Sequence, residues 1–573
     1  MIESNLIMPE KGSVFTTLKS LLAWVFITLV VALLIDNRHH KSGTFNWTTP
    51  MWGDQAGYYV YLPGLFIYDF DAKSFPEKIE EKTGFGFSLD QDKNKVISRY
   101  TSGIAILQAP FFLIIHGLAG LMDQPQDGFS GIYHKVPDLA ALFWCILGLF
   151  FLRNFLLFYY RPRTVWLTVL SLFAGTNVYY YAVESTGMSH IYSFGLFALV
   201  VWLTKIILSG DSNQLKFRYI LLNLLFALIV LIRPTNILIF PFLFCLDCSS
   251  KEEFFGRIKR FLSFQPLLVL VLSFLLVFLP QFIYWKYAFG SYLADSYGGF
   301  GFTNWKSPKL AGLWFAPNNG LFLYSPLFLA AIAGLFLMIR RRLLNGWVIL
   351  GTFLIASYVY ASWFVFSFGC SFGSRNFVEY AVLFSLPLGY LYSRIPGFKS
   401  YVRYPVILLL IFLTLFNLRL AYSYPRCFHG SDWDFELYRS FVIKINKYHK
   451  SADLIQPEIM LPANEYSKTI YLPATDISAI KFKKVVIKAR VKLEDLKSEA
   501  SLVLAVSTPD STIFWNGFKL KDQVPDHRIH KYKTVFGQFF LPDPLPLNST
   551  ITTYIWNIKK ETLTLSAFDL YLE

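Results

Sequence analysis

Two polar stretches of this chain could supply the charged groups of a transfer reaction. In the first, Trp52-Gly53-Asp54-Gln55-Ala56-Gly57-Tyr58-Tyr59, one carboxylate stands among glycines shortly after the first hydrophobic segment. A carboxylate so close to a membrane surface is costly unless it faces water or a partner. We therefore interpret Asp54 as a catalytic base at the mouth of a membrane-embedded cavity. The alternative is that Asp54 caps a short helix, because aspartate is a favoured N-cap residue.

The second stretch, residues 367–376, reads Ser-Phe-Gly-Cys-Ser-Phe-Gly-Ser-Arg-Asn. Glycines and serines before an arginine at a helix start bring backbone donors, the helix dipole and a guanidinium to one place, which is typical of an anion site. The pattern predicts that Arg375, with Ser371 and Ser374, binds a phosphate. The alternative is that Arg375 only pairs with Glu379 one helical turn later.

Several further polar residues are expected to line a substrate pocket: Glu184, His190, Tyr58, Tyr100, Asn318 and Arg233. Glu184 and His190 lie between two predicted spans, where ionisable groups are costly unless used, although segment 184–190 could equally be a capped turn. Arg233 precedes Pro234 at a break between spans. A side chain that extends to the membrane interface explains this arginine slightly better than a place in the substrate pocket does.

The composition places most of the chain in a bilayer. Of its 573 residues, 54% are hydrophobic and 16% are charged, whereas a soluble domain carries about 25% charged residues; the mean hydropathy is +0.43. The basic residues behind the net charge of +15 fall in short loops between apolar segments. This distribution indicates membrane orientation and no nucleic-acid partner.

The sequence predicts no definite metal centre. Five cysteines are scattered, and Cys245 and Cys248 form a single C-x-x-C with no second pair to complete a zinc site. Asp69 and Asp71 follow Asp54 closely enough that a divalent metal ion is possible without being required.

About eleven membrane spans are expected to position these residues. The first covers 21–35, and a long loop, 36–135, follows it with two stretches, 58–68 and 104–122, that we expect to lie in the membrane interface. Basic residues of alternate loops fall on one side, which predicts a cytoplasmic N-terminus and an extracytoplasmic first loop and tail. The later spans are expected at 136–157, 164–182, 189–208, 218–233, 236–248, 262–285, 321–339, 346–363, 377–393 and 404–421.

The tail changes to the alternating pattern of strands. Short strands separated by turns predict an antiparallel β-sandwich, jelly-roll-like, after the α-helical membrane domain. We expect a membrane domain over 1–423, a linker with one helix over 424–460 and an extracytoplasmic sandwich over 461–573. The predicted strands are 481–493, 501–507, 531–540, 550–556 and 562–572.

The order of these parts resembles the GT-C superfamily of membrane glycosyltransferases, which includes protein O-mannosyltransferases and the aminoarabinose transferase of lipid A. The resemblance covers residues 17–421 and is carried by Gly53-Asp54-Gln55 in the first loop, Tyr100-Thr101-Ser102-Gly103 before Ala109-Pro110-Phe111, and Ser371-Phe372-Gly373-Ser374-Arg375. In the last motif this chain has Ser374 where bacterial members commonly have proline.

The resemblance implies an inverting transfer of a sugar from a polyprenyl-phosphate carrier to an extracytoplasmic glycan, lipid or protein. Asp54 would be the base and Arg375 the phosphate clamp, in a multi-pass protein of the bacterial plasma membrane surrounded by membrane lipids. Two other functions compete. A flippase or transporter of lipid-linked sugars would show inverted halves with broken helices, of which Arg233-Pro234 is the single hint. A membrane-anchored binding protein would need only one span.

Overall fold

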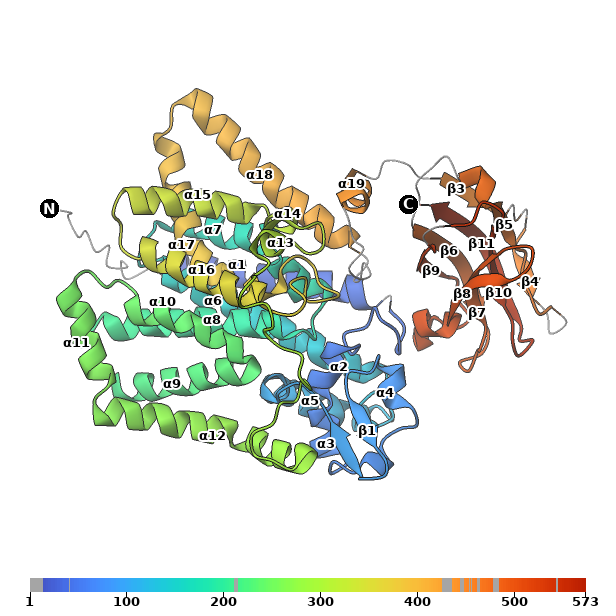
Figure 1. Cartoon of the computed structure of the whole chain (residues 1–573), viewed down its shortest axis with the longest axis horizontal. Helices are drawn as coiled ribbons and strands as arrows, with labels where there is room; N and C mark the ends of the chain where they lie inside the picture. Colours follow the sequence, from blue (N-terminus) through green and yellow to red (C-terminus); the bar gives the residue numbers. More distant parts are fainter. Residues whose placement is uncertain are drawn as a thin grey trace. The chain divides into compact units, whose positions relative to one another are not determined.

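The computed structural model describes residues 14–40, 42–210, 215–424, 435–443, 448–452, 454, 456–460, 464–477, 484–542 and 545–572. The chain divides into two compact units, a helical unit of residues 1–36 and 50–432 and a β-rich unit of residues 37–49 and 433–573 (Figure 1). The expected cytoplasmic start, residues 1–13, lies outside the described residues.

Seven helices of the described residues are long and apolar enough to cross a membrane, so the chain is an integral membrane protein. They are α1 (Val14–His39), α5 (Gly103–Leu121), α6 (Lys135–Leu156), α8 (Ser189–Leu208), α9 (Leu215–Ile232), α12 (Phe264–Phe289) and α18 (Ser400–Ser423). Helices occur at all eleven expected places, but several are too short for an unaided span, and the count of eleven is not confirmed.

The shorter helices are broken where the sequence cannot continue an α-helix. Pro234 ends α9, because proline lacks the amide hydrogen that the helix needs, and the chain continues as a 3-10 turn and α10 (Phe240–Cys245). A second break at Ser325 and Pro326 separates α14 (Leu321–Tyr324) from α15 (Leu327–Arg340). The remaining short helices are α7 (Pro162–Gly175), α13 (Leu310–Phe315), α16 (Gly346–Ala361) and α17 (Ala381–Arg394).

The first long loop is folded rather than extended. It contains α2 (Asp54–Tyr59), α3 (Tyr61–Phe66), α4 (Ile79–Lys82) and a two-stranded antiparallel sheet of β1 (Ser88–Asp90) and β2 (Lys95–Ile97). Figure 1 shows these elements gathered at one end of the helical unit, with α5 beside them. Helix α5 is the stretch expected to lie in the membrane interface, and its 19 residues are also long enough to span.

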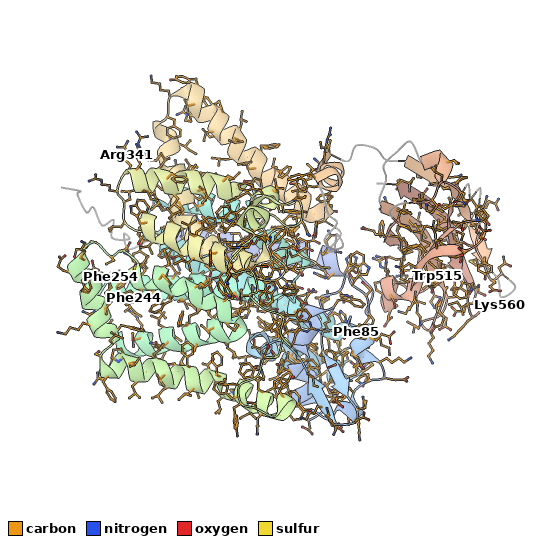
Figure 2. The ribbon with its side chains drawn as sticks, viewed as in Figure 1. Phe85, Phe244, Phe254, Arg341, Trp515 and Lys560 are labelled. Atoms are coloured by element: carbon orange, nitrogen blue, oxygen red, sulfur yellow. The ribbon has the colours of Figure 1, made fainter. Side chains whose placement is uncertain are left out.

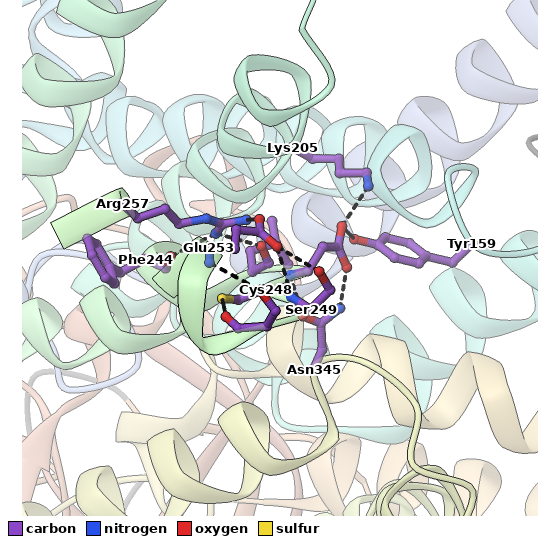
Figure 3. Close-up of polar contacts among 11 residues, drawn as sticks. Tyr159, Lys205, Phe244, Cys248, Ser249, Glu253, Arg257 and Asn345 are labelled. Carbon is purple, nitrogen blue, oxygen red and sulfur yellow. Dashed lines mark hydrogen bonds and ion pairs between the residues drawn. The ribbon is translucent and has the colours of Figure 1, made fainter. Parts of the chain in front are cut away.

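The sequence analysis did not predict α11 (Lys251–Phe261), nor the shorter helices α4, α13 and α20 (Ala474–Ile477). The start of α11 carries a recognisable signal, since the Ser250 side chain accepts a hydrogen bond from the Glu253 amide and Glu253 Oε2 accepts one from the Ser249 amide. Figure 3 shows this start near Tyr159, Lys205 and Asn345. These three residues bind Asp247, whose Oδ2 lies 2.6 Å from Lys205 Nζ and 2.7 Å from the Tyr159 hydroxyl.

The β-rich unit is a sandwich of two antiparallel sheets, in the orders β5-β10-β7-β8 and β3-β11-β6-β9, with β4 also paired to β11. The five expected strands are present as β6 (Lys484–Leu493), β7 (Ser501–Ser507), β9 (Lys533–Phe540), β10 (Thr550–Trp556) and β11 (Leu563–Leu572). Residues 481–483 of the first expected strand lie outside the described residues. The alternating pattern predicted for β6 is confirmed, because its apolar positions all lie in the core between the sheets: Val485, Ile487, Ala489, Val491 and Leu493.

The sandwich begins before the expected boundary at 461. Strands β3 (Tyr448–Ser451) and β4 (Glu458–Met460) pair with β11 inside the range expected as linker, which also contains helix α19 (Phe435–Ile443). Strands β5 (Ile470–Pro473) and β8 (Thr512–Lys519) were also missed. Residues 37–49, expected in the membrane domain, belong to this unit, where the Asn46 side chain donates to the Asp522 carbonyl.

Candidate active site

The two charged residues singled out in the sequence meet in the helical unit. Arg375 Nη1 lies 3.2 Å from Asp54 Oδ2, and the side chains are 17% and 35% exposed respectively. Asp54 is the first residue of α2, and the N-cap position belongs to Gly53, so Asp54 is not the cap that the alternative reading required. Gly53 has φ of 59°, a conformation that favours glycine and turns the chain into the helix.

Two tyrosines complete the surroundings of Asp54. The Tyr100 hydroxyl donates to Asp54 Oδ1 at 2.5 Å, and the rings of Tyr58 and Tyr100 lie 4.6 Å apart. Burial, followed by the Asp54 carboxylate, raises the pKa of both phenols, so both remain protonated donors at neutral pH. Burial lowers the pKa of Arg375, but the Asp54 carboxylate and the surrounding tyrosines raise it by more. The pKa of Arg375 therefore lies above its ordinary value.

The loop that carries Arg375 is braced from several elements. The Tyr181 hydroxyl accepts the Phe372 amide at 3.1 Å, the Tyr424 hydroxyl donates to the Ser371 carbonyl at 2.6 Å, and Asn177 Nδ2 donates to the Ser374 carbonyl at 3.1 Å. Cys370 is disulfide-bonded. These contacts fix the backbone immediately before Arg375, and with it the direction of the guanidinium.

The two serines expected to bind phosphate differ in their contacts. The Ser371 hydroxyl donates to the Ser367 and Gly373 carbonyls at 3.2 and 3.1 Å, so it stabilises its own loop. The Ser374 hydroxyl is buried next to Arg375 and has no hydrogen-bond partner among the described residues. An unpaired buried hydroxyl is costly, and a phosphate oxygen at this place would satisfy it.

A second charged cluster lies beside the first and centres on Arg233. Its Nη1 is 3.3 Å from Glu379 Oε1 and 2.9 Å from His190 Nδ1, and its Nη2 donates to Asn376 Oδ1. His190 and Glu379 are 1% and 0% exposed. The interface position favoured for Arg233 is therefore wrong, because its guanidinium points inward to a buried carboxylate. The alternative pairing of Arg375 with Glu379 is likewise replaced by the pairs Arg375–Asp54 and Arg233–Glu379.

His190 Nδ1 has two competing neighbours in this cluster. It lies 2.9 Å from Arg233 Nη1 and 3.2 Å from Glu379 Oε2. A nitrogen can accept from the guanidinium only when it carries no proton, and it can donate to the carboxylate only when it does. His190 Nδ1 therefore hydrogen-bonds to Glu379 when it carries a proton and to Arg233 when it does not.

The two clusters are linked through the backbone and through α2. Asn376, the acceptor for Arg233, directly follows Arg375. Gln55, next to Asp54, accepts the Gly187 amide at 3.0 Å, and the Ser189 hydroxyl lies 3.4 Å from that of Tyr58. The segment 184–190 is thus attached to α2, the helix that begins with Asp54.

The other expected pocket residues are placed as follows. Glu184 is 3% exposed at the end of a π-helical segment, Tyr180–Glu184. Asn318 lies in the turn before α14, where its neighbour Asn319 donates to the carbonyls of Ser367 and Gly369, both at 2.9 Å. Their part in a pocket stays a prediction.

No group of three or more His, Cys, Asp or Glu side chains that could hold a metal ion occurs within the described part of the chain. The Asp71 carboxylate caps a turn, accepting from the Lys73 amide at 3.1 Å and the Ser74 hydroxyl at 2.5 Å. These bonds lower the pKa of Asp71, the Ser74 bond most.

Sequence reasoning did not assign a role to Glu379, Asn376 or Asp138. Asp138 is 4% exposed in α6 and accepts from the Thr186 hydroxyl at 2.8 Å. A signal was available for Glu379 and Asp138, since each carboxylate adjoins or interrupts an apolar run, and such groups are paired or functional.

Comparison with known proteins was made by family model, by sequence and by structure. No family model and no curated protein matches the chain. Solved structures similar to it include an archaeal oligosaccharyltransferase, ArnT and an arabinosyltransferase.

Three of these structures illustrate the similarity. The oligosaccharyltransferase AglB from Archaeoglobus fulgidus, in complex with an inhibitory peptide and a dolichol-phosphate, is 14% identical with a TM-score of 0.43, over 71% of this chain and 56% of its own. ArnT from Cupriavidus metallidurans bound to undecaprenyl phosphate is 12% identical with a TM-score of 0.40, over 74% and 69%. The arabinosyltransferase EmbB from Mycobacterium smegmatis is 10% identical with a TM-score of 0.37, over 98% and 66%.

The chain spans a little over half the length of the archaeal oligosaccharyltransferases that it matches. At these identities and TM-scores the likeness concerns the fold alone.

Proposed function

We propose that this protein is an inverting glycosyltransferase that moves a sugar from a polyprenyl-phosphate carrier to an extracytoplasmic acceptor. The acceptor is a glycan, a lipid or a protein, and the site faces away from the cytoplasm of a bacterial plasma membrane. Asp54 acts as the base and Arg375 holds the donor phosphate.

One observation carries this proposal: Asp54 and Arg375, far apart in the sequence, are paired at 3.2 Å and both are partly exposed. Transfer from a sugar phosphate needs a base for the incoming hydroxyl and a cation for the departing phosphate. The two groups act on the attacking and the leaving oxygen of one anomeric carbon, so both must belong to the same site. The Asp54–Arg375 pair meets that requirement.

The proposed step is a single displacement. The acceptor hydroxyl gives its proton to Asp54 as its oxygen forms a bond to the anomeric carbon. The bond from that carbon to the phosphate oxygen breaks, and its electron pair leaves with the phosphate. Because attack and departure occur on opposite faces, the anomeric configuration inverts.

Arg375 can bind the donor phosphate while it remains paired with Asp54. A guanidinium carries five N–H donors in a fixed plane, and the pair with Asp54 engages Nη1. The remaining donors, with the unpaired Ser374 hydroxyl, supply a binding set for phosphate oxygens. Ser371 supports the same loop through its bonds to Ser367 and Gly373.

The Arg233 cluster positions this site. Arg233 is held by Glu379, His190 and Asn376, and Asn376 adjoins Arg375. Arg233 therefore acts through the loop rather than on the substrate. Tyr58, Tyr100, Glu184, His190 and Asn318 are proposed to line the pocket around the donor and acceptor sugars.

A lipid-linked sugar transporter is the second candidate, and the helix breaks favour it. The chain interrupts α9 at Pro234 and separates α14 from α15 at Pro326, and transporters often bind substrates at discontinuous helices. Such a protein would move the carrier across the bilayer and leave the sugar–phosphate bond intact.

The decisive experiment measures release of sugar from undecaprenyl-phosphate-linked mannose, glucose and aminoarabinose by the purified protein in liposomes. We expect the natural protein to cleave at least one donor, and Asp54→Asn and Arg375→Ala to lose turnover by about 10²–10⁴-fold. Arg375→Ala should also weaken donor binding, whereas Asp54→Asn should not.

Asp69→Asn and Arg394→Ala are matched controls, because each removes the same charge outside the proposed site. Normal insertion and unfolding temperature in all four variants would exclude misfolding. Retained turnover in Asp54→Asn would overturn its role as base. Carrier movement across the liposome without cleavage, in the natural protein, would establish the transporter instead.

A further inference from the structure

The outward face of one sheet of the sandwich carries a group of aromatic side chains, three of them exposed and two, Tyr554 and Trp556, half-buried. These are Tyr466, Tyr471, Trp515, Tyr554 and Trp556, hereafter the aromatic face. Trp515, labelled in Figure 2, is 53% exposed, and Tyr466 and Tyr471 are 52% and 60% exposed. Large rings left in water are unusual when gathered in one place, and such patches mark binding sites.

The strand register proves that these rings share one face. Tyr471, Thr552, Ala505 and Trp515 lie opposite one another across β5, β10, β7 and β8, and Tyr466, Trp556, Ser501 and Lys519 form a parallel row. The residues between them in sequence, such as Leu502, Leu504 and Ile555, point the other way and lie in the core of the sandwich. The five rings are therefore outside the core.

The two tryptophans close over the central strand β7. Their ring centroids are 6.2 Å apart at an interplanar angle of 87°. Val503 of β7 points outward yet is 0% exposed, and it lies opposite Gly517 of β8, which has no side chain. The indoles thus meet at a right angle and form a corner over this part of the sheet, where they help to cover Val503.

Hydrogen-bonding groups stand at one edge of this corner. Glu499 Oε2 lies 2.5 Å from Lys519 Nζ, and its Oε1 lies 3.7 Å from Lys559 Nζ. The Trp556 indole donates to Glu465 Oε1 at 3.4 Å. Two carboxylates and two ammonium groups supply acceptors and donors with no net charge.

The charge pattern selects the ligand. Balanced charges give no attraction for an anionic lipid or a nucleic acid, and carboxylates at the rim oppose insertion into a bilayer. A pyranose ring has an apolar C–H face and a rim of hydroxyls that donate and accept. The flat aromatic rings can stack on the C–H face of such a ligand, and the paired charges beside them can bind its hydroxyls.

We propose that the aromatic face is a binding site for an uncharged glycan chain. One pyranose ring stacks on the indole corner of Trp515 and Trp556, and its hydroxyls bond to Glu499 and Lys519. The neighbouring pair of Tyr466 and Tyr554, with ring centroids 5.4 Å apart, contacts the next sugar. This site is separate from the proposed donor site and does not depend on Asp54 or Arg375.

The test is binding of three hexasaccharides, cellohexaose, N-acetylchitohexaose and α-1,6-linked mannohexaose, to the full-length protein in nanodiscs. Calorimetry and saturation-transfer NMR would report affinity. We expect at least one to bind, with about a tenfold or greater loss in Trp515→Ala and in Trp556→Ala. Trp515→Tyr should restore most of the affinity, because a ring remains.

Phe536→Ala is the matched control, since Phe536 is an exposed ring, 44% exposed, on the opposite sheet. Asp54→Asn should bind glycan normally while losing donor turnover, which separates this proposal from the proposed function. Three outcomes would overturn the proposal. They are no binding by any of the three glycans, quenching of Trp515 emission by brominated nanodisc lipids, and a protein dimer that Trp515→Ala dissociates.

Discussion

Arg233 Nη1 lies 3.3 Å from Glu379 Oε1, and the Glu379 side chain is completely buried. The pair joins Arg233, the residue that follows α9, to the segment that leads into α17. Two charges so placed stabilise the protein only as a pair, because either one alone would be left buried without its partner.

The first prediction concerns this pair. Glu379→Gln leaves the Arg233 charge uncompensated and should lower the free energy of unfolding by about 3–5 kcal/mol. Thermal unfolding in detergent, followed by fluorescence-detected gel filtration, measures the loss. The double variant Glu379→Gln with Arg233→Gln should recover part of it, and a double variant less stable than Glu379→Gln alone would contradict the pairing.

The second prediction concerns Tyr100. Its hydroxyl donates to Asp54 Oδ1 at 2.5 Å, and a hydrogen bond to a charged group contributes about 1.5–3 kcal/mol. Tyr100→Phe should therefore reduce kcat about 10- to 100-fold, and it should also lower the free energy of unfolding by up to about 3 kcal/mol. Tyr68→Phe is the control, because that hydroxyl bonds to the Asp127 carbonyl in the same loop. Equal effects of the two substitutions would remove any special role for Tyr100.

The third prediction compares two glycines of the Arg375 loop. Gly369 and Gly373 have φ of 67° and 63°, so alanine strains both by about 1–2 kcal/mol. At Gly373 a Cβ would also lie 3.0 Å from Tyr324 Cβ, whereas nothing lies within 4 Å at Gly369. Gly373→Ala should raise the KM for the lipid-linked donor more than Gly369→Ala does. The reverse order in a steady-state assay would show that the phosphate loop is not held by this contact.

The fourth prediction is a pH dependence in the sandwich. Burial raises the pKa of Asp522 to about 6 from an ordinary value of 3.8. The folded state then binds this proton more tightly than the unfolded state, so the stabilisation is full below about pH 4 and is lost as the pH rises through 6. The loss at neutral pH is about 2 kcal/mol after allowance for partial exposure.

Hydrogen–deuterium exchange of peptides from β6 and β9, corrected for intrinsic rates, measures this change. Asp522→Asn should reduce the difference in protection between pH 4 and pH 7. An undiminished difference in that variant would assign the pH dependence to another group.

The sequence alone was sufficient wherever a local pattern fixes the answer. Helix α8 and strands β7 and β10 begin and end at the expected residues. A mostly apolar run of about 20 residues forms a helix in a bilayer, and a short apolar or alternating run bounded by turn residues forms a strand. Asp54 and Arg375 were selected for the same local reason, a charge among glycines beside apolar segments.

Short elements and chain boundaries depended on tertiary contacts. The strands β3 and β4 are only a few residues long and exist because β11 offers them a paired edge. Segment 37–49 joins the sandwich unit although it begins in the last turn of the first hydrophobic helix, α1. A local pattern contains no information about which distant edge a segment will meet.

The pairing of charges was likewise decided by the tertiary structure. Spacing offered Glu379 as the alternative partner of Arg375 and favoured an interface position for Arg233, since pairs of helical neighbours and side chains that extend to the interface are the local solutions. In the folded chain Arg375 meets Asp54 and Arg233 meets Glu379. A charge inside a membrane protein takes the partner that burial brings to it, and the sequence identifies which residues carry charge but not which of them share a site.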